Sequence, residues 1–399
     1  MKRQLIIITG IAVALLSLYF DSLTANAQSM SKNEEMARTE QFIQKQFNAF
    51  TSAENVHNAF FQLHSDSFNL DQSLVYGQDH EGVGLSKEVP FYVASIGKTF
   101  TATIIMQLIE EGLLESDELL VNLLPEKTTS GLHVLNGVDF TDVITVHQLL
   151  NHTSGLPDYF EDMPIKGANM MALLFESPNR FWEPEELIEF TKQNFKPHFA
   201  PGKRYHYSDT EYILIGLIIE QLTRQALHDT FTERIFKPLN MRRTAMNLRS
   251  QPLDRTTPVF APMYAGGHEI SKLTSLSADW AGGGITSTTS ELITFHKALV
   301  AGKLISKEAY TQMQNWIHES QGTYYGYGLR KWEFQELSDQ LPPITLVGHS
   351  GSTGSYMYYA PELGTYFAGT FNQTEQIDSH IHFLIKVITE LSTIKNSNP

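Results

Sequence analysis

The sequence predicts an α+β fold: an antiparallel sheet built from both chain ends, flanked by helices, with a helical lobe inserted between its two parts. Short runs rich in Phe, Leu, Val and Tyr occur near both ends of the 399-residue chain, at 59–64 and 67–76 and again at 355–360 and 365–371. Such runs, separated by turn residues, are typical of hairpin strands. The middle of the chain instead carries apolar residues at helical spacing, which places the helical lobe at about residues 101–255.

The N-terminus is predicted to be a signal peptide, residues 1–27. A basic start is followed by an apolar run at 5–20 and by small residues at 25–27, so cleavage is expected before Gln28. The apolar run is shorter than the roughly 20 residues that span a bilayer, so no stable membrane span is expected after signal removal. The sequence therefore predicts an exported protein, periplasmic or extracellular.

The mature chain is predicted to contain an N-terminal helical segment, residues 28–55, and one large domain, residues 56–399. It has no cysteine, which excludes disulfides, cysteine nucleophiles and cysteine-based zinc sites. The net charge of the whole chain is −15, and removing residues 1–27 takes away two basic residues and one acidic residue, leaving −16. Such a surface repels phosphate backbones, so no nucleic-acid partner is expected.

Three local patterns define elements near the candidate motifs. A largely buried helix is predicted to begin at or just before Ser95 and to end near Gly112. The glycine run at 282–284 predicts a tight loop before a capped helix. A strand at 343–347 is followed by a polar turn at 348–354, which leads into the last predicted hairpin.

The segment Ser95-Ile96-Gly97-Lys98 is the first candidate motif. At the start of a helix, residues i and i+3 share a face, so the Lys98 ammonium can reach the Ser95 hydroxyl. A serine becomes a nucleophile when a neighbouring base takes its proton, and a lysine serves as that base when burial or another cation lowers its pKa. The free N–H groups of a helix start also favour an oxyanion. An ordinary surface Ser and Lys would give the same spacing.

Two further motifs follow. Tyr207-Ser208-Asp209 precedes a long apolar helix, and a Tyr close to a Lys can act as a general base; an aromatic residue packed at a helix start fits the same pattern. His349-Ser350-Gly351-Ser352 lies between two predicted strands, where an ordinary turn is the alternative. Gly351 would let a substrate approach the backbone closely, and the Ser352 N–H is a candidate oxyanion donor.

The order SIGK, YSD, HSG resembles the three motifs of the serine β-lactamase/DD-peptidase superfamily. It is most similar to the branch of class C β-lactamases, D-alanyl-D-alanine carboxypeptidases and related esterases. The linking segments FYVASIGKTFTA, HQLLNHTSGLPDY, PGKRYHYSDTEYILIG and AGGGITST match in the same order, and the resemblance covers about residues 59–371. It implies a β-lactamase-like fold, a site in the cleft between the two lobes and no cofactor.

The resemblance also implies roles for the motif residues. Ser95 forms the acyl-enzyme, and Lys98 and Tyr207 share the acid/base work. The N–H groups of Ser95 and Ser352 form the oxyanion hole. The implied reaction is the hydrolysis of an amide or ester, such as a cell-wall D-Ala-D-Ala peptide or a small ester.

Two substrate-side positions depart from the family pattern. Asp209 stands where the family usually has Asn, whose amide donates to a substrate carbonyl, and an ionised Asp cannot donate. Asp209 is expected instead to hold Lys98 charged, which leaves more of the base role to Tyr207. His349, two residues before Gly351, replaces a Lys and removes a permanent charge, so a substrate carboxylate is held less firmly. Both departures predict weakened recognition of penicillins.

Other mechanisms are alternatives. An α/β-hydrolase with Ser350 as nucleophile requires a G-x-S-x-G elbow followed by a helix, but position 352 is Ser and a strand is predicted next. A weak β-lactamase, or a sensor module that is occupied without turnover, is compatible with Asp209. No metal site is expected, since His147 and His152 are five residues apart and no HExxH motif occurs.

The expected partner is a small-molecule or peptide substrate, including cell-wall peptides; the sequence does not indicate an oligomeric state. Pocket shape decides among these substrates. The segments 157–182 and 327–343, with Phe181, Trp182 and Trp332, are expected to form an apolar wall of that pocket.

Overall fold

The computed structural model describes residues 34–53 and 56–397, and the chain divides into two compact units between Ala49 and Phe50. The predicted signal peptide, residues 1–27, lies outside the described residues. A helix covers residues 34–51, as the amphipathic pattern of the N-terminal segment predicts. Among the described helices, none combines the length and the apolar character that crossing a bilayer requires.

The second unit contains an eight-stranded antiparallel sheet in the order β10-β11-β12-β13-β14-β15-β1-β2. The N-terminal hairpin joins the C-terminal strands because β1 pairs with β15, from Phe60 opposite Thr370 to Ser65 opposite Thr365. This arrangement confirms the predicted sheet built from both chain ends. The strands are β1 (Asn58–Ser65), β2 (Leu70–Gly77), β10 (Ile317–Ser320), β11 (Thr323–Tyr325), β12 (Arg330–Glu333), β13 (Thr345–Ser350), β14 (Tyr356–Ala360) and β15 (Thr365–Thr370).

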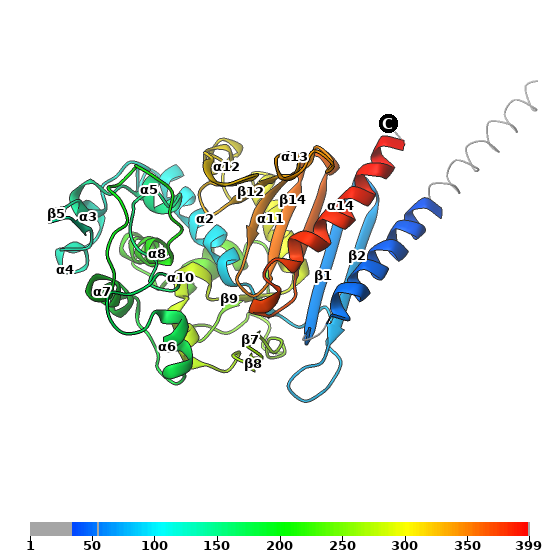
Figure 1. Ribbon diagram of the computed structural model, residues 1–399, viewed down its shortest axis with the longest axis horizontal. Coiled ribbons are helices and arrows are strands. Elements are labelled where there is room, and N and C mark those ends of the chain that lie inside the picture. Colours follow the sequence, from blue (N-terminus) through cyan, green and yellow to red (C-terminus); the bar gives the residue numbers. More distant parts are fainter. Residues whose placement is uncertain (1–33, 54–55, 398–399) are drawn as a thin grey trace, which may run out of the picture. The chain divides into compact units, whose positions relative to one another are not determined.

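Helices cover both faces of this sheet (Figure 1). α11 (Thr289–Val300) packs against β1, β14 and β15, and α14 (Ser379–Ser397) lies across the opposite face. Successive side chains of a strand point to opposite faces. Phe60 of β1 therefore stacks on Phe91, with ring centroids 5.4 Å apart, while Phe61 meets a phenylalanine ring of α14 at 5.0 Å. The double cover explains why two consecutive Phe residues are both buried.

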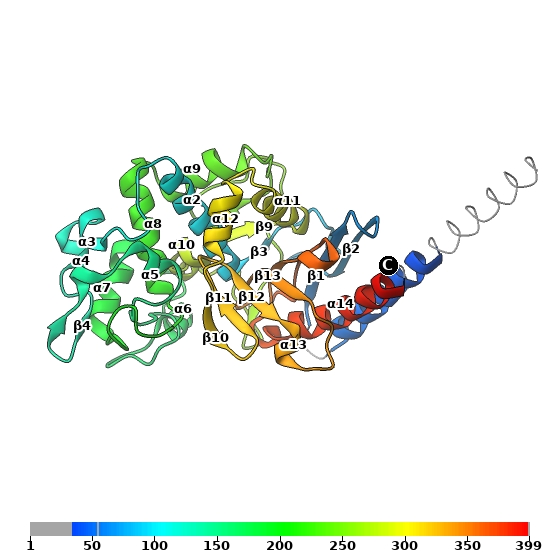
Figure 2. The same cartoon turned by 90° about the horizontal axis from the view of Figure 1, so that it is seen from above.

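The helical lobe is organised around α8 (Asp209–Thr223), which contacts α2, α5, α7 and α10. Every residue of α8 from Asp209 to Ile219 is buried. In both views the β12 side of the large sheet lies nearer to this lobe than the β1–β2 hairpin does (Figure 2). The other helices are α2 (Gly97–Glu110), α3 (Leu120–Leu123), α4 (Glu126–Thr129), α5 (Val146–Leu150), α6 (Met170–Glu176), α7 (Pro184–Asn194), α9 (Leu227–Phe231), α10 (Trp280–Gly283), α12 (Lys307–Met313) and α13 (Phe334–Leu337).

The second unit contains three smaller sheets among its described residues. One is three-stranded, in the order β3-β9-β6, and the others are the two-stranded pairs β4–β5 and β7–β8. Val93 continues the first of them, since its N–H donates to the carbonyl of Ile285 at 2.9 Å. The strands are β3 (Phe91–Tyr92), β4 (Val134–Leu135), β5 (Val138–Asp139), β6 (Ala245–Met246), β7 (Tyr264–Ala265), β8 (His268–Glu269) and β9 (Ile285–Ser287).

The structure differs from the predicted elements in three places. Strands β10, β11 and β12 are not predicted from the sequence. β13 continues to Ser350, where the sequence predicts a turn from Gly348, because pairing with β12 and β14 on its two sides extends it. Gly282 and Gly283 lie in the helical turn α10 rather than in a tight loop, because their N–H groups both donate to the carbonyl of Asp279, at 2.8 and 3.2 Å.

Candidate active site

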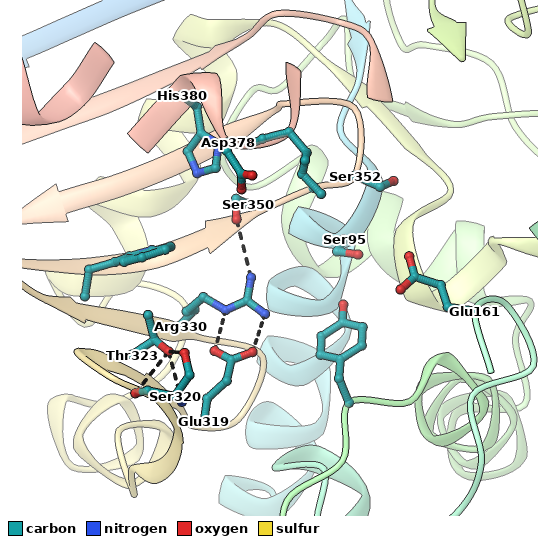
Figure 3. A pocket seen from close by; sticks show the side chains of 14 residues that line it. Ser95, Glu161, Glu319, Ser320, Thr323, Arg330, Ser350, Ser352, Asp378 and His380 are labelled. Carbon is teal, nitrogen blue, oxygen red and sulfur yellow. Dashed lines mark hydrogen bonds and ion pairs between the residues drawn. The ribbon is translucent and has the colours of Figure 1, made fainter. Parts of the chain in front are cut away.

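Ser95 lies in the 3₁₀ turn Ala94–Ile96, directly before α2. Residues 91–100 are buried except for Ser95, which is partly exposed. The preceding Ala94 has φ 47°, a left-handed backbone conformation that residues other than glycine seldom adopt. This conformation turns the chain so that Ser95 lines a cavity of about 370 Å³ (Figure 3).

Lys98, one helical turn further on, is fully buried beneath Ser95. Its Nζ lies 3.3 Å from Ser95 Oγ and 3.1 Å from the carbonyl of Gly282, and it forms an ion pair with Asp209 Oδ1. Burial alone lowers the pKa of Lys98, but the Asp209 carboxylate outweighs it and raises that pKa above its usual value. Lys98 is therefore charged in the resting protein. Its partner is Asp209, as we expect from the sequence.

Tyr207 lines the same cavity, two residues before α8 begins. Lys98 Nζ lies 4.9 Å from the centre of its ring, and the guanidinium carbon of Arg330 lies 5.8 Å from it. Burial raises the pKa of Tyr207, and the two cations offset only part of this rise. The phenol is therefore protonated in the resting protein and is placed to give a proton.

The glycine run that ends α10 brings Lys98 and Ser95 to their positions. A Cβ on Gly283 would lie 2.6 Å from the carbonyl carbon of Ala94, and one on Gly97 would lie 2.8 Å from Cα of Gly283. Because real Cβ atoms essentially never approach so closely, two backbones can pass here only when both positions are glycine. The segment AGGGITST therefore shapes the site from below and carries no reacting group.

Asp279 is a second carboxyl group near Lys98 and is half-buried. Its Oδ2 accepts a hydrogen bond from the Tyr92 hydroxyl at 3.0 Å. Burial and the negative charge of Asp209 raise the pKa of Asp279 to about 7, although Lys98 and the Tyr92 hydrogen bond act in the opposite direction. The site thus contains the Asp209 carboxylate, which is paired with Lys98, and the Asp279 carboxyl group, whose pKa is about 7.

The turn after β13 lies against the Ser95 turn. A Cβ on Gly351 would lie 2.6 Å from the carbonyl oxygen of Val93 and 2.7 Å from Cβ of Ala94, so only glycine permits this approach. Gly351 and Ser352 line the cavity opposite Ser95. Within the described residues, the N–H groups of Ser95 and Ser352 donate to no backbone carbonyl. Both are free to donate to a ligand.

His349 occupies a different place from the one implied by the family resemblance. Its ring is fully buried and does not line the cavity. Nε2 lies 2.9 Å from the Tyr325 hydroxyl, and Nδ1 lies 2.7 Å from the Ser350 carbonyl. Burial lowers the pKa of His349, and the nearby cations of Arg330 and Lys98 lower it further, so the ring is neutral. The expectation that His349 contacts the far end of the substrate is corrected: it supports β13 from behind.

Arg330 of β12 provides a cation in the cavity that no sequence motif predicts. Its Nε and Nη2 donate to the Glu319 carboxylate at 2.8 and 2.7 Å, and Nη1 donates to Ser350 Oγ at 3.4 Å (Figure 3). Arg330 and Trp332 are two residues apart on one strand, so they share a face, and both line the cavity. Recognition of β12 as a strand would have identified this pair.

Carboxylates dominate the charge of the cavity. Glu161, Glu319 and Asp378 line it together with Arg330, and the Glu319 charge balances that of Arg330. Figure 3 shows Arg330 and Glu161 on opposite sides of Ser95. Burial raises the pKa of Glu161, and the charge of Asp209 acts in the same direction. The cavity is therefore negative overall, and the cations close to Ser95 are already paired.

The predicted apolar wall is largely wrong. Trp332 lines the cavity, but Trp182 is buried beside Phe190 in the helical lobe, and Phe181 is exposed beside Arg249. These two aromatic residues follow α6, which packs on the 3₁₀ turn at 274–278 rather than on the site. From the segment 157–182, the cavity receives Glu161.

The alternative nucleophile Ser350 has no elbow around it. It ends β13, and the chain after the turn continues as β14, so no helix follows the serine. Its hydroxyl accepts a hydrogen bond from Arg330 rather than from a histidine or lysine. These features argue against an α/β-hydrolase mechanism at this residue.

The HTSG segment forms a support behind Tyr207. His152 has φ 61°, and its Nδ1 is hydrogen-bonded to the buried Glu211, which also accepts from Ser154 Oγ at 2.5 Å. The His152 ring lies 4.3 Å from the Tyr207 ring, centre to centre. Burial lowers the pKa of His152 and raises that of Glu211. The segment therefore supports Tyr207 from behind.

Comparisons with known proteins agree with this geometry. A profile of the Beta-lactamase family matches residues 62–385. Penicillin-binding protein 4* of Bacillus subtilis (strain 168) is 26% identical over 303 residues, which are 71% of this chain; the chain spans 60% of that protein's length. A D-stereospecific amidohydrolase from Streptomyces sp. is similar in structure, with a TM-score of 0.68 and 29% identity over 85% of this chain and 94% of that one. D-amino acid amidase from Ochrobactrum anthropi SV3 shares the fold, with a TM-score of 0.73, 23% identity and coverage of 91% and 100%.

Proposed function

Because the chain belongs to the Beta-lactamase family, we propose that this serine hydrolase uses Ser95 as its nucleophile and forms an acyl-enzyme from an amide. The observation that carries the proposal is the position of Ser95: partly exposed in a buried segment, it opens into the cavity with Lys98 Nζ 3.3 Å away. The N–H groups of Ser95 and Ser352 would stabilise the oxyanion that forms when the carbonyl is attacked.

The ion pair of Lys98 with Asp209 determines how the proton of Ser95 leaves. Lys98 is charged at rest, so it can accept that proton only after giving one to Asp209. The neutral amine then takes the Ser95 proton as the C–O bond forms. Tyr207, protonated at rest, gives its proton to the leaving nitrogen and is restored by Lys98. Each proton moves between groups that already line or adjoin the cavity.

The substrate class we propose is an amide or short peptide of a D-amino acid with a free amino group. The D-stereospecific amidohydrolase that shares 29% of its sequence supports the stereochemistry and the bond type. The charges of the cavity support the amine: Glu161, Glu319 and Asp378 face a single arginine, which Glu319 already binds. A protonated amino group would find an unpaired carboxylate in Glu161 or Asp378.

Other substrates of this chemistry remain as competing proposals. A cell-wall D-Ala-D-Ala peptide presents a carboxylate, and Arg330 is the group that would bind it after release from Glu319. A small neutral ester would need neither a cavity carboxylate nor Arg330 for binding. Weak β-lactamase activity would follow if the acyl-enzyme of a β-lactam were hydrolysed slowly, and occupation without turnover, as in a sensor, would follow if it were not hydrolysed.

The nucleophile is tested by intact mass after treatment of residues 28–399 with a fluorophosphonate and, separately, with a penicillin. The adduct is expected in the wild-type chain and in Ser350→Ala, and it should be lost in Ser95→Ala. Labelling that survives Ser95→Ala but disappears in Ser350→Ala would transfer the nucleophile to Ser350. No adduct in any chain would favour a binding module without catalysis.

The amine is tested by comparing kcat/KM for D-alanine amide and N-acetyl-D-alanine amide. Acetylation removes the charge, and we expect it to lower kcat/KM at least about tenfold, the value of a single charged hydrogen bond of roughly 1.4 kcal/mol. Glu161→Gln should reduce this preference while fluorophosphonate labelling of Ser95 continues. Equal rates for the two amides would reject the amine and leave the nucleophile assignment intact.

A further inference from the structure

Asp162, His198 and His206 converge at the surface of the helical lobe, next to the cavity. Nε2 of His198 lies 2.6 Å from Asp162 Oδ2, and Nε2 of His206 lies 3.0 Å from the same oxygen. The two imidazole rings lie 3.8 Å apart, centre to centre, and the three ligand atoms are all within 4.8 Å of one another. We infer that these three side chains form a binding site for a divalent transition-metal ion such as Zn²⁺.

The donor set fits such an ion. Two imidazole nitrogens and one carboxylate oxygen are ligands that Zn²⁺ and its neighbours bind, with a fourth position left for water or another ligand. Ligands about 2.0–2.1 Å from a tetrahedral ion stand about 3.3 Å apart, so the present spacings of 2.6 and 3.0 Å need to widen by less than 1 Å. The exposed fractions of the three side chains, 19%, 38% and 28%, leave the group open to an ion from solvent.

The backbone around the ligands is held in place. The N–H of His198 donates to the carbonyl of Gly155 at 2.9 Å, and the N–H of His206 donates to the carbonyl of His152 at 2.9 Å. The N–H of Asp158 donates to Asp162 Oδ2 at 2.7 Å. A carboxylate ligand is commonly oriented by such a second hydrogen bond. Two loops, one between α5 and α6 and one between α7 and α8, thus present the ligands with little freedom, so little conformational entropy is lost when an ion binds.

An ion here would lie directly behind the cavity wall. Asp162 follows Glu161 and His206 precedes Tyr207, and both neighbours line the cavity. Binding would therefore tie together the loops that carry the acid and the carboxylate of the candidate active site. The inferred site departs from the expectation that the chain has no metal site, because Asp162 lies on another loop, 36 and 44 residues before the two histidines, and the three residues form no motif.

The experiment is isothermal titration of residues 28–399, freed of metal with a chelator, with ZnCl₂ and with CoCl₂. One ion per chain is expected, and Co²⁺ should give visible absorption bands typical of four or five nitrogen and oxygen ligands. His198→Ala and Asp162→Asn should each weaken binding by at least about tenfold, since even the loss of an outer contact to a metal ligand costs this much. His268→Ala is the matched control: it removes an exposed histidine of β8 and should bind as the wild type does.

Melting temperature provides an independent readout. An ion that binds only the folded chain raises its stability, so Zn²⁺ should raise the melting temperature of the wild type and of His268→Ala but not of His198→Ala. Melting curves in chelator show whether each variant is folded, and Asp162→Asn keeps the shape of the side chain if His198→Ala does not fold. Failure of the wild type to bind either ion, or unchanged affinity in His198→Ala and Asp162→Asn, would overturn the site.

Discussion

The charge of Lys98 depends on one neighbour. Complete burial disfavours an ammonium ion, and Asp209 reverses that effect through the ion pair. An asparagine in place of Asp209 would leave the amine without a counter-ion at that position and would offer an amide N–H₂ to a substrate carbonyl. Asp209 is therefore the main source of the resting charge of Lys98, and the neighbouring groups Tyr207 and Asp279 raise the pKa of Lys98 further.

Asp209→Asn is expected to increase acylation by penicillin about tenfold or more, because Lys98 then loses its proton more easily and the amide can donate to the β-lactam side chain. The rate of adduct formation, followed by intact mass, measures it. Asp142→Asn is the control, since it removes an exposed carboxylate that does not line the cavity, and it should leave the penicillin rate unchanged. No gain in Asp209→Asn would show that Asp209 does not limit penicillin recognition.

Asp279 makes stability depend on pH. Its pKa is about 7 in the folded chain, above the ordinary value of 3.8, so the folded state binds this proton more tightly than the unfolded state. Its contribution is fully present below about pH 4 and is lost as the pH rises to about 7, with a slope of at most about 1.4 kcal/mol per pH unit. Asp279→Asn should flatten the fall in free energy of unfolding between pH 4 and 7, measured by urea denaturation. Parallel curves for the two chains would contradict the raised pKa.

Much of the candidate site follows from local sequence. Ser95 and Lys98 are one helical turn apart, so their contact can be expected from spacing. The contact of Lys98 with Asp209 can be expected from their opposite charges and from the family resemblance. Arg330 and Glu161 cannot be found in this way, because each belongs to a loop or a short strand that meets the site through the tertiary fold. The prediction for His349 is wrong for the same reason. The residue occupies the expected position of the motif, but the pairing of β13 places its ring in the core.

At the scale of elements, three backbone segments pack at the site more closely than any residue but glycine permits. Gly351 brings the turn after β13 against Val93 and Ala94, and Gly97 and Gly283 allow α2 to cross α10. The two oxyanion donors come from different elements, so their separation depends on this contact. The close packing of the turn after β13 against the Ser95 turn thus determines where the two N–H groups would meet a substrate carbonyl.

Gly351→Ala is expected to destabilise the chain by about 1–3 kcal/mol, the usual cost of an overpacked position. It should slow fluorophosphonate labelling of Ser95 by about 100-fold, because a displacement of about 1 Å in a reacting group costs this much. Thermal unfolding and labelling rates measure the two effects. Gly84→Ala is the matched control, since a Cβ there meets nothing within 4 Å. A normal labelling rate in Gly351→Ala would show that the turn is not part of the oxyanion site.

The elements that the sequence predicts well have strong local signals. β1, β2, β14 and β15 are apolar runs bounded by turn residues, and α5 begins with the capping box of Thr145 and Gln148. β10, β11 and β12 are three or four residues long, and most of their residues are half-buried or exposed. They pair with one another and with β13, and no pattern of two-residue alternation is long enough to reveal them.

At the scale of the whole molecule, we predict that the chain is exported and cleaved before Gln28. The basic start, the short apolar run and the small residues at 25–27 carry this prediction. Expression of the full chain in a bacterial host, followed by fractionation and intact mass, should recover a species that begins at Gln28 outside the cytoplasm. Replacing Ala27 with Arg should block cleavage. A cytoplasmic product that begins at Met1 would contradict export.

The pairing of β1 with β15 determines when activity can first arise during synthesis. The Thr365 hydroxyl donates to the Ser65 hydroxyl at 2.9 Å, across 300 residues of chain. A ribosome releases β1 long before β15, so the edge of β1 that pairs with β15 stays unpaired until the chain as far as β15 has been made. Ser95 is translated early and Ser352 late, and the two meet only once this edge closes. If Ser95 is the nucleophile as we propose, its activity is timed by the synthesis of β15, and a chain that stops before β15 holds that serine without a closed sheet around it.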